Sequence, residues 1–267
     1  MPELPELEII AKLLTNQLSG KTIKKTVVHN NIVVHGLPVS EFELNAVGER
    51  IESVRADGKF LIISLNNYDL IVNPMLTGRF RVITRFKKPT SYDMVSIHTG
   101  EGTLWYSDAK KMGRIYLVPQ NEYSQVAGFE NRGPSALDTE LTLEIFRERI
   151  KRHNGQIKNV LRNQRFIKGI GNAYADEILL YAGILPFRTR PTLKDEEVEK
   201  LYHAMRKVLT RIRDILSERS LDDIAIEKRD FLMVHNHGGT ICPLCGGRVS
   251  EVSANRFKTN YCQTCQK

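Results

Sequence analysis

The start of the chain has a helical pattern of apolar residues. They recur at intervals of three and four: Leu7, Ile10, Leu13, Leu14 and Leu18. This spacing predicts one buried helical face. Pro5 fits only a first turn, because it lacks a backbone N–H and its φ is fixed. The pattern ends at Gly20, so the sequence predicts a helix that begins close to the N-terminus.

Short β-branched or alternating segments follow this helix. They cover residues 22–29, 51–55, 60–65, 70–72, 79–84, 94–98, 103–106 and 114–118. Asp57-Gly58 and Asn66-Asn67 are typical of hairpin turns. Eight short strands separated by turns predict a β-sandwich or a flattened barrel.

The second half of the chain has helical periodicity. The helices are predicted at residues 142–152, 156–163, 173–182 and 195–218. Thr142 and Asp195 are the expected starts of the first and last of them. Residues 127–135, rich in Gly, Asn and Pro, predict a linker before this region. Residues 217–239 are polar and of mixed charge, and they predict a mobile connector.

The first eight residues also carry candidate chemistry. Removal of Met1 would leave Pro2 with a free secondary amine beside Glu3. An α-amine has a pKa of about 7.7–8.0, so part of it is an unprotonated nucleophile near neutral pH. An acidic first turn favoured by the helix dipole is the alternative explanation. A retained Met1 would block the amine.

Composition and charge narrow the class of protein. The 267 residues are 41% hydrophobic, enough for real cores, and the net charge is +8. Such a basic surplus suggests contact with a polyanion. No stretch approaches the roughly 20 apolar residues of a membrane span. We therefore expect a cytoplasmic, nucleoid-associated protein.

The cysteines predict a metal site. All four form two Cys-x-x-Cys pairs, Cys242 with Cys245 and Cys262 with Cys265, sixteen residues apart. This spacing is typical of a zinc ribbon, in which each pair holds one side of a tetrahedral ion and a β-hairpin lies between them. Disulfides are disfavoured, because the sequence shows no secretion signal.

Several loops combine cations with apolar or glycine residues. Residues 73–78 and 109–113 place Met or Leu beside turn formers, and duplex-distorting proteins build wedges in this way. The alternative is that these residues belong to the sandwich core. Residues 85–89 form a further basic loop. Lys59 follows the Asp57-Gly58 turn, where a lysine is often merely solvated.

A glycine-rich turn precedes the third helix of the second half. Gly169-Ile170-Gly171 allows close backbone approach, and the helix N-terminus at Asn172 then favours a phosphate. Basic residues surround this turn and strengthen the interpretation: Lys151, Arg152, Lys158, Arg162, Arg165 and Lys168.

Together these motifs resemble the formamidopyrimidine-DNA glycosylase family, which includes the endonuclease VIII-like proteins. The matching segments are Pro2-Glu3-Leu4-Pro5-Glu6, Gly58-Lys59-Phe60, Gly133-Pro134, residues 164–177 and the four-cysteine ribbon. The resemblance spans the whole chain. The opening segment fits the formamidopyrimidine branch better than the endonuclease VIII branch.

The resemblance implies a two-domain α+β fold. We expect an N-terminal β-sandwich domain with a leading helix at residues 1–125 and a linker at 126–135. A helical helix-two-turn-helix domain is expected at 136–238, and a zinc-ribbon β-hairpin at 239–267. The implied partner is double-stranded DNA with a damaged base or an abasic site, bound by a monomer that holds one structural Zn²⁺.

The resemblance also implies site roles. Pro2 would attack C1′ of a flipped nucleotide to form an iminium, and Glu3 would move protons. Lys59 and a cation of the zinc hairpin, Arg256 or Lys258, would serve the elimination steps. Lys158 and Asn172 would contact the DNA backbone. The chain is then a bifunctional glycosylase and abasic-site lyase.

Some positions depart from the family pattern. The residues that would fill the gap left by the flipped base are Leu76, Lys110 and Met112, where the family typically has Met, Arg and Phe. A lysine cannot make the bidentate base contact of arginine, so we expect looser selectivity for the opposite base. Tyr92 stands near an expected His, and Phe257 near an expected Arg. We therefore expect a preferred lesion other than 8-oxoguanine.

Two alternative functions remain open on the sequence. A non-catalytic binder of damaged or branched DNA would account for the changed loops. An RNA- or ribosome-associated zinc protein would account for the charge and the ribbon, but not for the N-terminus.

Overall fold

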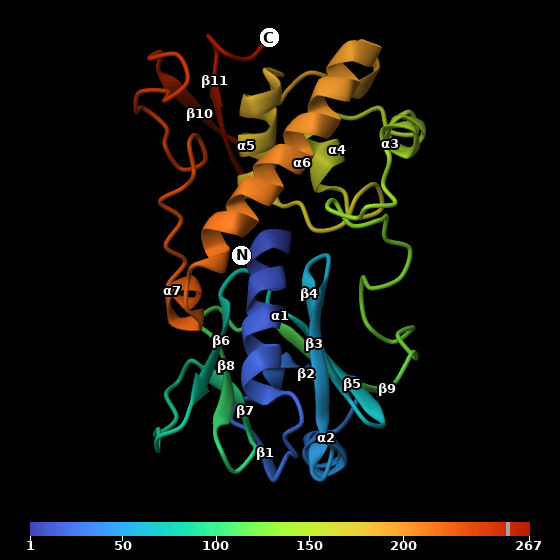
Figure 1. Ribbon diagram of the computed structural model, residues 1–267, viewed down its shortest axis with the longest axis vertical. Coiled ribbons are helices and arrows are strands. Elements are labelled where there is room, and N and C mark those ends of the chain that lie inside the picture. The colour runs from blue at the N-terminus through green and yellow to red at the C-terminus, as the bar shows by residue number, and fades with distance from the viewer. Residues whose placement is uncertain (255–256) are drawn as a thin grey trace. The chain divides into compact units, whose positions relative to one another are not determined.

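The computed structural model describes residues 1–254 and 257–267, and their contacts divide the chain into two units (Figure 1). Residues 1–131 and 216–228 form the first unit. Residues 132–215 and 229–267 form the second. The chain therefore passes from one unit to the other three times.

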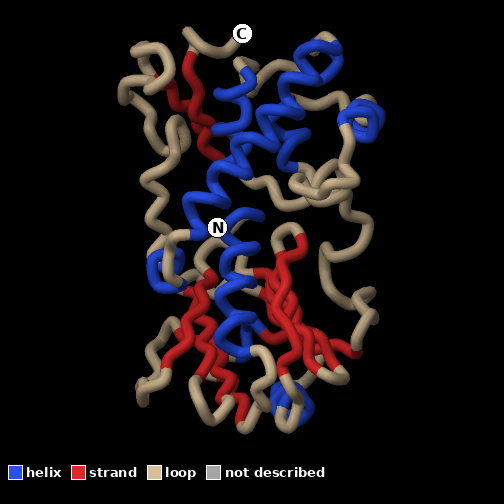
Figure 2. Tube along the Cα trace, in the orientation of Figure 1, coloured by secondary structure: helices blue, strands red, loops and turns tan. Residues whose placement is uncertain are grey.

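Two β-sheets form most of the first unit (Figure 2). One sheet has the strand order β2-β9-β5-β4-β3 and the other has the order β1-β7-β8-β6. All neighbouring strands are antiparallel except β2 and β9, which are parallel. The strands are β1 (Lys25–Val28), β2 (Val34–His35), β3 (Ile51–Asp57), β4 (Phe60–Leu65), β5 (Tyr68–Asn73), β6 (Gly78–Ile83), β7 (Asp93–His98), β8 (Thr103–Asp108) and β9 (Arg114–Pro119).

The sandwich core lies between these sheets. Ile63 and Leu70 of one sheet share the interior with Phe80 and Leu104 of the other, and all four are buried. Each of the eight strands predicted from alternation is present. The two predicted hairpins are present as well: Asp57 pairs with Phe60 across Gly58-Lys59, and Ser64 pairs with Asp69 around Asn66-Asn67. The expected β-sandwich is therefore confirmed.

Helix α1 (Leu4–Leu18) leads the first unit and packs on β3 and β4 (Figure 1). Its apolar stripe is buried, with Leu7 and Leu14 fully covered. The start of the helix is fixed by a capping box, in which the backbone N–H of Glu3 donates to the Glu6 carboxylate at 3.1 Å. Gly20, with a φ of +82°, follows its end, as the pattern predicted.

Two short helices of the first unit were not predicted. Helix α2 (Val39–Ala46) buries only Phe42 and Ala46, too few residues for a visible period. A single 3₁₀ turn, η1 (Asn31–Val33), precedes β2. Helix α7 (Leu221–Ala225) lies inside the segment 217–239, which the sequence predicted as a mobile connector without any helix.

Helix α7 is ordered by local and tertiary contacts. Ser220 and Asp223 form a capping box at its start. Leu221 and Ile224 are buried, and the helix packs on α1 and on β6. Mixed charge concealed this short amphipathic turn in the sequence.

The second unit is helical and ends in a hairpin. Its helices are α3 (Leu143–Ile150), α4 (Ile157–Arg162), α5 (Asn172–Ala182) and α6 (Asp195–Ser217), with a 3₁₀ turn η2 (Arg190–Thr192), and its hairpin is β10 (Val249–Ala254) and β11 (Phe257–Cys262). The four predicted helices are confirmed. Thr142 caps α3 by accepting from the N–H of Ile145. None of the helices in the described part of the chain is long and apolar enough to span a membrane.

The segment that joins the sandwich to the first helices is tied down at both ends. Val126 and Phe129 pack with Phe60 in the first unit. In the second unit, the N–H of Gly133 donates to the carbonyl of Gln164 at 2.8 Å. A Cβ at Gly133 would lie 2.1 Å from the carbonyl oxygen of Phe166, so only glycine fits there.

A buried carboxylate stabilises the outer side of the four-stranded sheet. Asp93 is 3% exposed and pairs with Lys87 at 2.5 Å. It also accepts from Ser107 Oγ at 2.6 Å and from the N–H and hydroxyl of Thr90. Burial alone would raise the pKa of Asp93, but Lys87 and these hydrogen bonds together lower it to about 2.

We predict that Asp93→Asn lowers the free energy of unfolding at neutral pH by about 2 kcal/mol. A depressed carboxyl pKa stabilises the fold above its unfolded value of 3.8 and ceases to do so as the pH falls toward 2. The difference between wild type and variant should therefore shrink below about pH 4. Urea denaturation at a series of pH values measures it, and a difference that stays constant would contradict the prediction.

Candidate active site and metal centre

The proposed nucleophile lies at the fixed start of α1. Pro2 and Glu3 are both buried, and they directly precede the first helical turn. With Met1 present, the terminal amine donates to Glu227 Oε1 at 3.0 Å. Arg79 of β6 holds the same carboxylate, with Nη2 2.7 Å from Oε2, and donates through Nε to the carbonyl of Ala225.

These contacts bring a carboxylate to the N-terminus. The Met1 nitrogen and the Pro2 nitrogen are three bonds apart, which limits their separation to about 4 Å. The Glu227 carboxylate therefore lies near the amine that removal of Met1 would create. Neither Glu227 nor Arg79 was singled out from the sequence, because each belongs to an unremarkable charged stretch.

Lys59 occupies the tight turn between β3 and β4. This turn has two residues, Gly58 and Lys59, and Gly58 adopts a φ of +66°. Glycine adopts this conformation more easily than other residues, so Gly58 suits the tight two-residue turn that places Lys59. Lys59 is half-buried rather than fully solvated.

Two loops of the first unit are joined through one buried carboxylate. Asp108 is fully buried and accepts from the N–H groups of Met112 (2.8 Å) and Gly113 (2.7 Å). It also accepts from the hydroxyl of Thr77, and Thr77 Oγ1 in turn accepts from the N–H of Lys110 at 2.9 Å. The structure thus brings together loops that the sequence could only note separately.

The tips of these loops carry the predicted apolar residues. Leu76 is 40% exposed and Met112 is 43% exposed, so they are not core residues. Lys110 is exposed beside them. Met75 and Lys111 have φ values of +47° and +53°, and such values are uncommon for residues other than glycine. Two strained turns therefore present the two apolar tips.

We predict that Asp108→Ala lowers the free energy of unfolding by about 3 kcal/mol, because several buried donors lose a charged acceptor. Asp222→Ala is the matched control, since the side chain of Asp222 is 82% exposed. Urea denaturation of both variants measures the effect. A loss for Asp108→Ala no greater than that of the control would contradict the proposed role of Asp108.

In the second unit, Asn172 is the first residue of α5. Its side-chain amide donates to the carbonyl of Lys258 in β11 at 2.9 Å. Within the described residues its Oδ1 is buried without a partner. The preceding turn is held by Gln164, which accepts from the N–H of Gly169 and donates to the carbonyl of Ile170.

Lys158 does not lie where a DNA-contacting residue is expected. Its side chain is 5% exposed and pairs with Asp176 of α5 at 2.6 Å. Its ammonium also donates to the Lys258 carbonyl and to Thr259 Oγ1, both at 2.9 Å. A lysine with these partners is a structural ion, so the sequence-based assignment of Lys158 to phosphate binding is not supported by its position.

The buried acids of α5 also hold the segment before the hairpin. Asp176 Oδ2 lies 2.7 Å from Nδ1 of His235. Glu177 accepts from the N–H groups of residues 233–235 at 2.8–2.9 Å. Burial raises the pKa of Glu177, and these three N–H groups oppose that effect.

Of the two cations predicted on the hairpin, Lys258 and Arg256, only Lys258 lies within the described residues. Lys258 is exposed and pairs with Glu251 at 2.9 Å. Arg256 lies outside the described residues. Phe257 is half exposed, and the guanidinium carbon of Arg162 lies over its ring, 4.0 Å from the ring centroid.

Tyr92 of the first unit is 57% exposed, and its carbonyl accepts from the N–H of Asp108.

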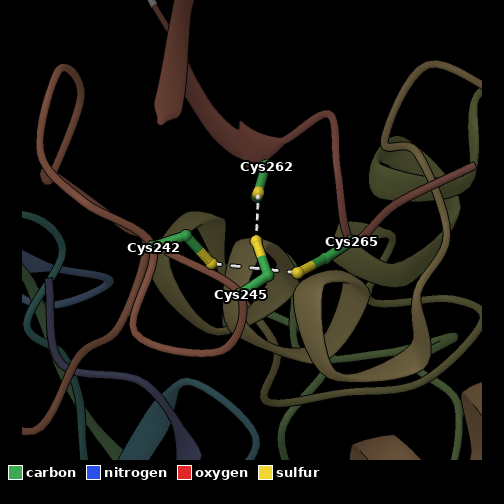
Figure 3. A group of neighbouring side chains, drawn as sticks. All are labelled: Cys242, Cys245, Cys262 and Cys265. Carbon is green, nitrogen blue, oxygen red and sulfur yellow. Dashed lines mark hydrogen bonds between the residues drawn. The ribbon is translucent and has the colours of Figure 1, made fainter. Parts of the chain in front are cut away.

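The four cysteines form one cluster that could hold a metal ion (Figure 3). Their sulfur atoms all lie within 4.8 Å of one another. The pairs Cys242–Cys265 and Cys245–Cys262 are 3.9 Å and 3.5 Å apart. Tetrahedral coordination with bonds of about 2.3 Å requires sulfur–sulfur distances of about 3.8 Å, so the cluster fits one ion. The cysteines are not disulfide-bonded.

Comparison with known proteins agrees with this geometry. The Formamidopyrimidine-DNA glycosylase N-terminal domain model matches residues 1–115, and the H2TH domain model of the same enzyme matches residues 132–216. The chain belongs to the formamidopyrimidine-DNA glycosylase family. A formamidopyrimidine-DNA glycosylase of Pelotomaculum thermopropionicum is 33% identical over all of this chain and 99% of its own length. One of Enterococcus faecalis is 32% identical over all of this chain and 98% of its own length.

Solved structures of formamidopyrimidine-DNA glycosylases share the fold. A Lactococcus lactis variant in complex with Fapy-dG-containing DNA has a TM-score of 0.91, with 23% identity and complete coverage of both chains. The Lactococcus lactis enzyme bound to DNA containing an abasic site has a TM-score of 0.88, with 23% identity and 99% coverage of each chain. These likenesses confirm the two-domain α+β architecture.

Proposed function

We propose that this chain is a base-excision DNA glycosylase that also cleaves the strand at abasic sites, with Pro2 as its nucleophile. Family membership supports the glycosylase class. The placement of Pro2 and Glu3 at a fixed helix start is the observation that carries the proposal. The unit that holds them also presents Lys59 and the loops joined by Asp108.

The reaction follows from the chemistry of a secondary amine. After removal of Met1, Pro2 nitrogen bonds to C1′ of a flipped nucleotide while the bond from C1′ to the base breaks, and the base leaves with a proton. The C1′–O4′ bond then breaks, O4′ takes a proton, and the nitrogen lone pair forms the C1′=N⁺ iminium. This iminium acidifies the neighbouring C2′ proton. Loss of that proton expels the 3′ phosphate and cuts the strand.

Each of the other predicted residues has a role in these steps. Glu3 moves protons as the sugar ring opens, and Lys59 contacts the phosphate or donates a proton during elimination. The Glu227 carboxylate, held by Arg79, is our proposed partner for the free amine once Met1 is removed. Arg256 or Lys258 of the hairpin assists the later elimination.

The DNA contacts divide into two groups. Leu76, Lys110 and Met112 fill the gap left by the flipped nucleotide, which their joint presentation on adjoining loops supports. Asn172 and Lys258 contact the backbone and position the duplex. Lys158 would hold these two residues in position, because its ammonium and the Asn172 amide donate to the same carbonyl, that of Lys258.

The substrate we propose is a damaged base other than 8-oxoguanine. Lys110 replaces the expected arginine, so discrimination of the opposite base is weaker. The loop before the ribbon, which in the family covers an oxidised purine, is shorter here and lacks its usual glycines, and helix α7 lies in this part of the chain. A panel of single-lesion duplexes, including oxidised pyrimidines, ring-opened purines and hydantoins, would rank the substrates. An 8-oxoguanine preference would contradict the proposal.

The nucleophile can be tested by borohydride trapping on abasic-site DNA. We predict a covalent adduct that mass spectrometry maps to Pro2 of the Met-trimmed protein. Pro2→Gly should reduce its yield by a factor on the order of 100. Pro5→Ala is the control, because it removes a proline from the same helix start and leaves the terminal amine intact. An adduct mapped elsewhere, or full trapping by Pro2→Gly, would refute the mechanism.

The metal we propose is a single structural Zn²⁺ at Cys242, Cys245, Cys262 and Cys265. Four thiolates in a tetrahedral arrangement favour zinc, and a structural zinc contributes directly to folding energy. The ion would hold the base of the β10–β11 hairpin and so the position of Lys258.

We predict one zinc ion per chain, measured by elemental analysis of the purified protein. Cys245→Ser should lower both the zinc content and the melting temperature, whereas Ser253→Ala, at an exposed position of β10, should change neither. A metal-free protein with wild-type melting would contradict the assignment.

A further inference from the structure

A cavity of about 550 Å³ lies on the outer face of the four-stranded sheet, within the first unit. Its central ring comes from the alternation of side chains between the two faces of β8. Leu104 and Tyr106 point into the sandwich core, so Trp105 between them lies on the opposite face and lines the cavity. None of the residues assigned above to catalysis or to the apolar loop tips lines this cavity.

Aromatic and imidazole rings form its floor. His29 of the segment after β1 stacks on Trp105, with ring centroids 5.3 Å apart and planes 8° apart. His98 of β7 packs edge-on against the same indole. Ser96 joins the two histidines, 2.9 Å from Nε2 of His29 and 3.2 Å from Nε2 of His98. The floor is therefore a connected set of rings that also offers polar atoms.

Burial keeps both histidines uncharged near neutral pH. It lowers the pKa of His29 and also the pKa of His98, which Lys25 lowers further. A neutral imidazole offers one donor and one acceptor. Among the described residues, the indole N–H of Trp105 is buried without an acceptor.

The rim is cationic and carries an exposed aromatic ring. Lys24 and Lys25 line one part, and Arg85 and Lys87 line another, against a single acid, Glu101. Lys87 places its ammonium 4.0 Å from the Trp105 ring centroid. Glu101 is itself paired with Lys21 at 2.9 Å.

Residues 85–89 form the loop at the rim of the cavity, which we call the rim loop. In it Phe86 stands between Arg85 and Lys87 in the sequence and is 96% exposed. Its ring is therefore available for contact with a ligand at the rim of the cavity. Its position beside Arg85 combines a stacking surface with an anion-binding group.

We propose that this cavity binds a nucleotide, with its phosphate on the rim cations and its base against Phe86 and the histidine–tryptophan floor. The volume falls within the range of small-molecule sites. Stacking of bases on aromatic side chains beside cations is how proteins bind nucleotides without sequence preference. Lys87 is already paired with Asp93, but an apolar ligand would leave the other three rim cations, Lys24, Lys25 and Arg85, unused. Inorganic phosphate would leave the rings unused.

The chain offers an internal probe, because Trp105 is its only tryptophan. Intrinsic fluorescence therefore reports on this cavity even if nucleic acid also binds elsewhere. Titration with deoxyadenosine monophosphate should give a saturable change in emission. Deoxyribose 5-phosphate, which lacks the base, should bind about tenfold more weakly or not at all.

Variants of the rim loop supply the second part of the test. Arg85→Ala and Phe86→Ala should each weaken nucleotide binding by about tenfold. Both side chains are exposed, so the fold should not suffer. Lys88→Ala is the matched control, since Lys88 belongs to the same exposed loop but does not line the cavity, and its affinity should equal that of wild type.

A parallel titration with a single strand distinguishes a nucleotide within a nucleic-acid strand from a free nucleotide. If a short 5′-phosphorylated single strand binds more tightly than the mononucleotide and shows the same loss in both variants, the cavity holds a nucleotide of a strand. If the mononucleotide binds at least as tightly, the ligand is free nucleotide. An absent or non-saturable change with both probes would overturn the proposal, as would equal affinity for deoxyribose 5-phosphate or equal weakening by Lys88→Ala.

Discussion

A buried ion cluster on α5 determines the arrangement of the second unit. Asp176 accepts from Lys158 of α4, from His235 and from the backbone N–H of Asn260 in β11. Its neighbour Glu177 holds the segment that leads into the hairpin. Because a buried charge that loses its partner is strongly destabilising, these segments are constrained to move together. The position of Asn172, one turn earlier on α5, is thereby coupled to the β10–β11 hairpin, whose strand β11 ends at Cys262 of the cysteine cluster.

The first unit uses acids in the same way. Asp93 and Asp108 are buried and saturated with donors, and Glu227 is occupied by Arg79 and the terminal amine. Asp93 and Glu227 are paired with cations of the same unit, so these charges cancel within the fold. The formal net charge of +8 therefore remains as a surplus of positive charge. This suits a protein whose partner is a polyanion.

The sequence predicted the strongly periodic parts well. The eight strands, the four helices of the second unit and α1 are present because each buries a regular stripe, as Leu7 and Leu14 show in α1. The cysteine spacing predicted a cluster that the structure shows. Helix α7 and the burial of Lys158 against Asp176 were not predicted, for a different reason. A charged residue looks the same in a sequence whether it is solvated or buried against a partner distant in the chain.

The return of residues 216–228 to the first unit has a practical meaning for dissection of the protein. A fragment that stops at residue 131 would lack the helix that covers part of α1 and β6. It would also leave Arg79 without its carboxylate. The sandwich is thus a discontinuous folding unit, and its final piece arrives only after most of the helices have been synthesised. Autonomous folding of an amino-terminal half is therefore not to be expected.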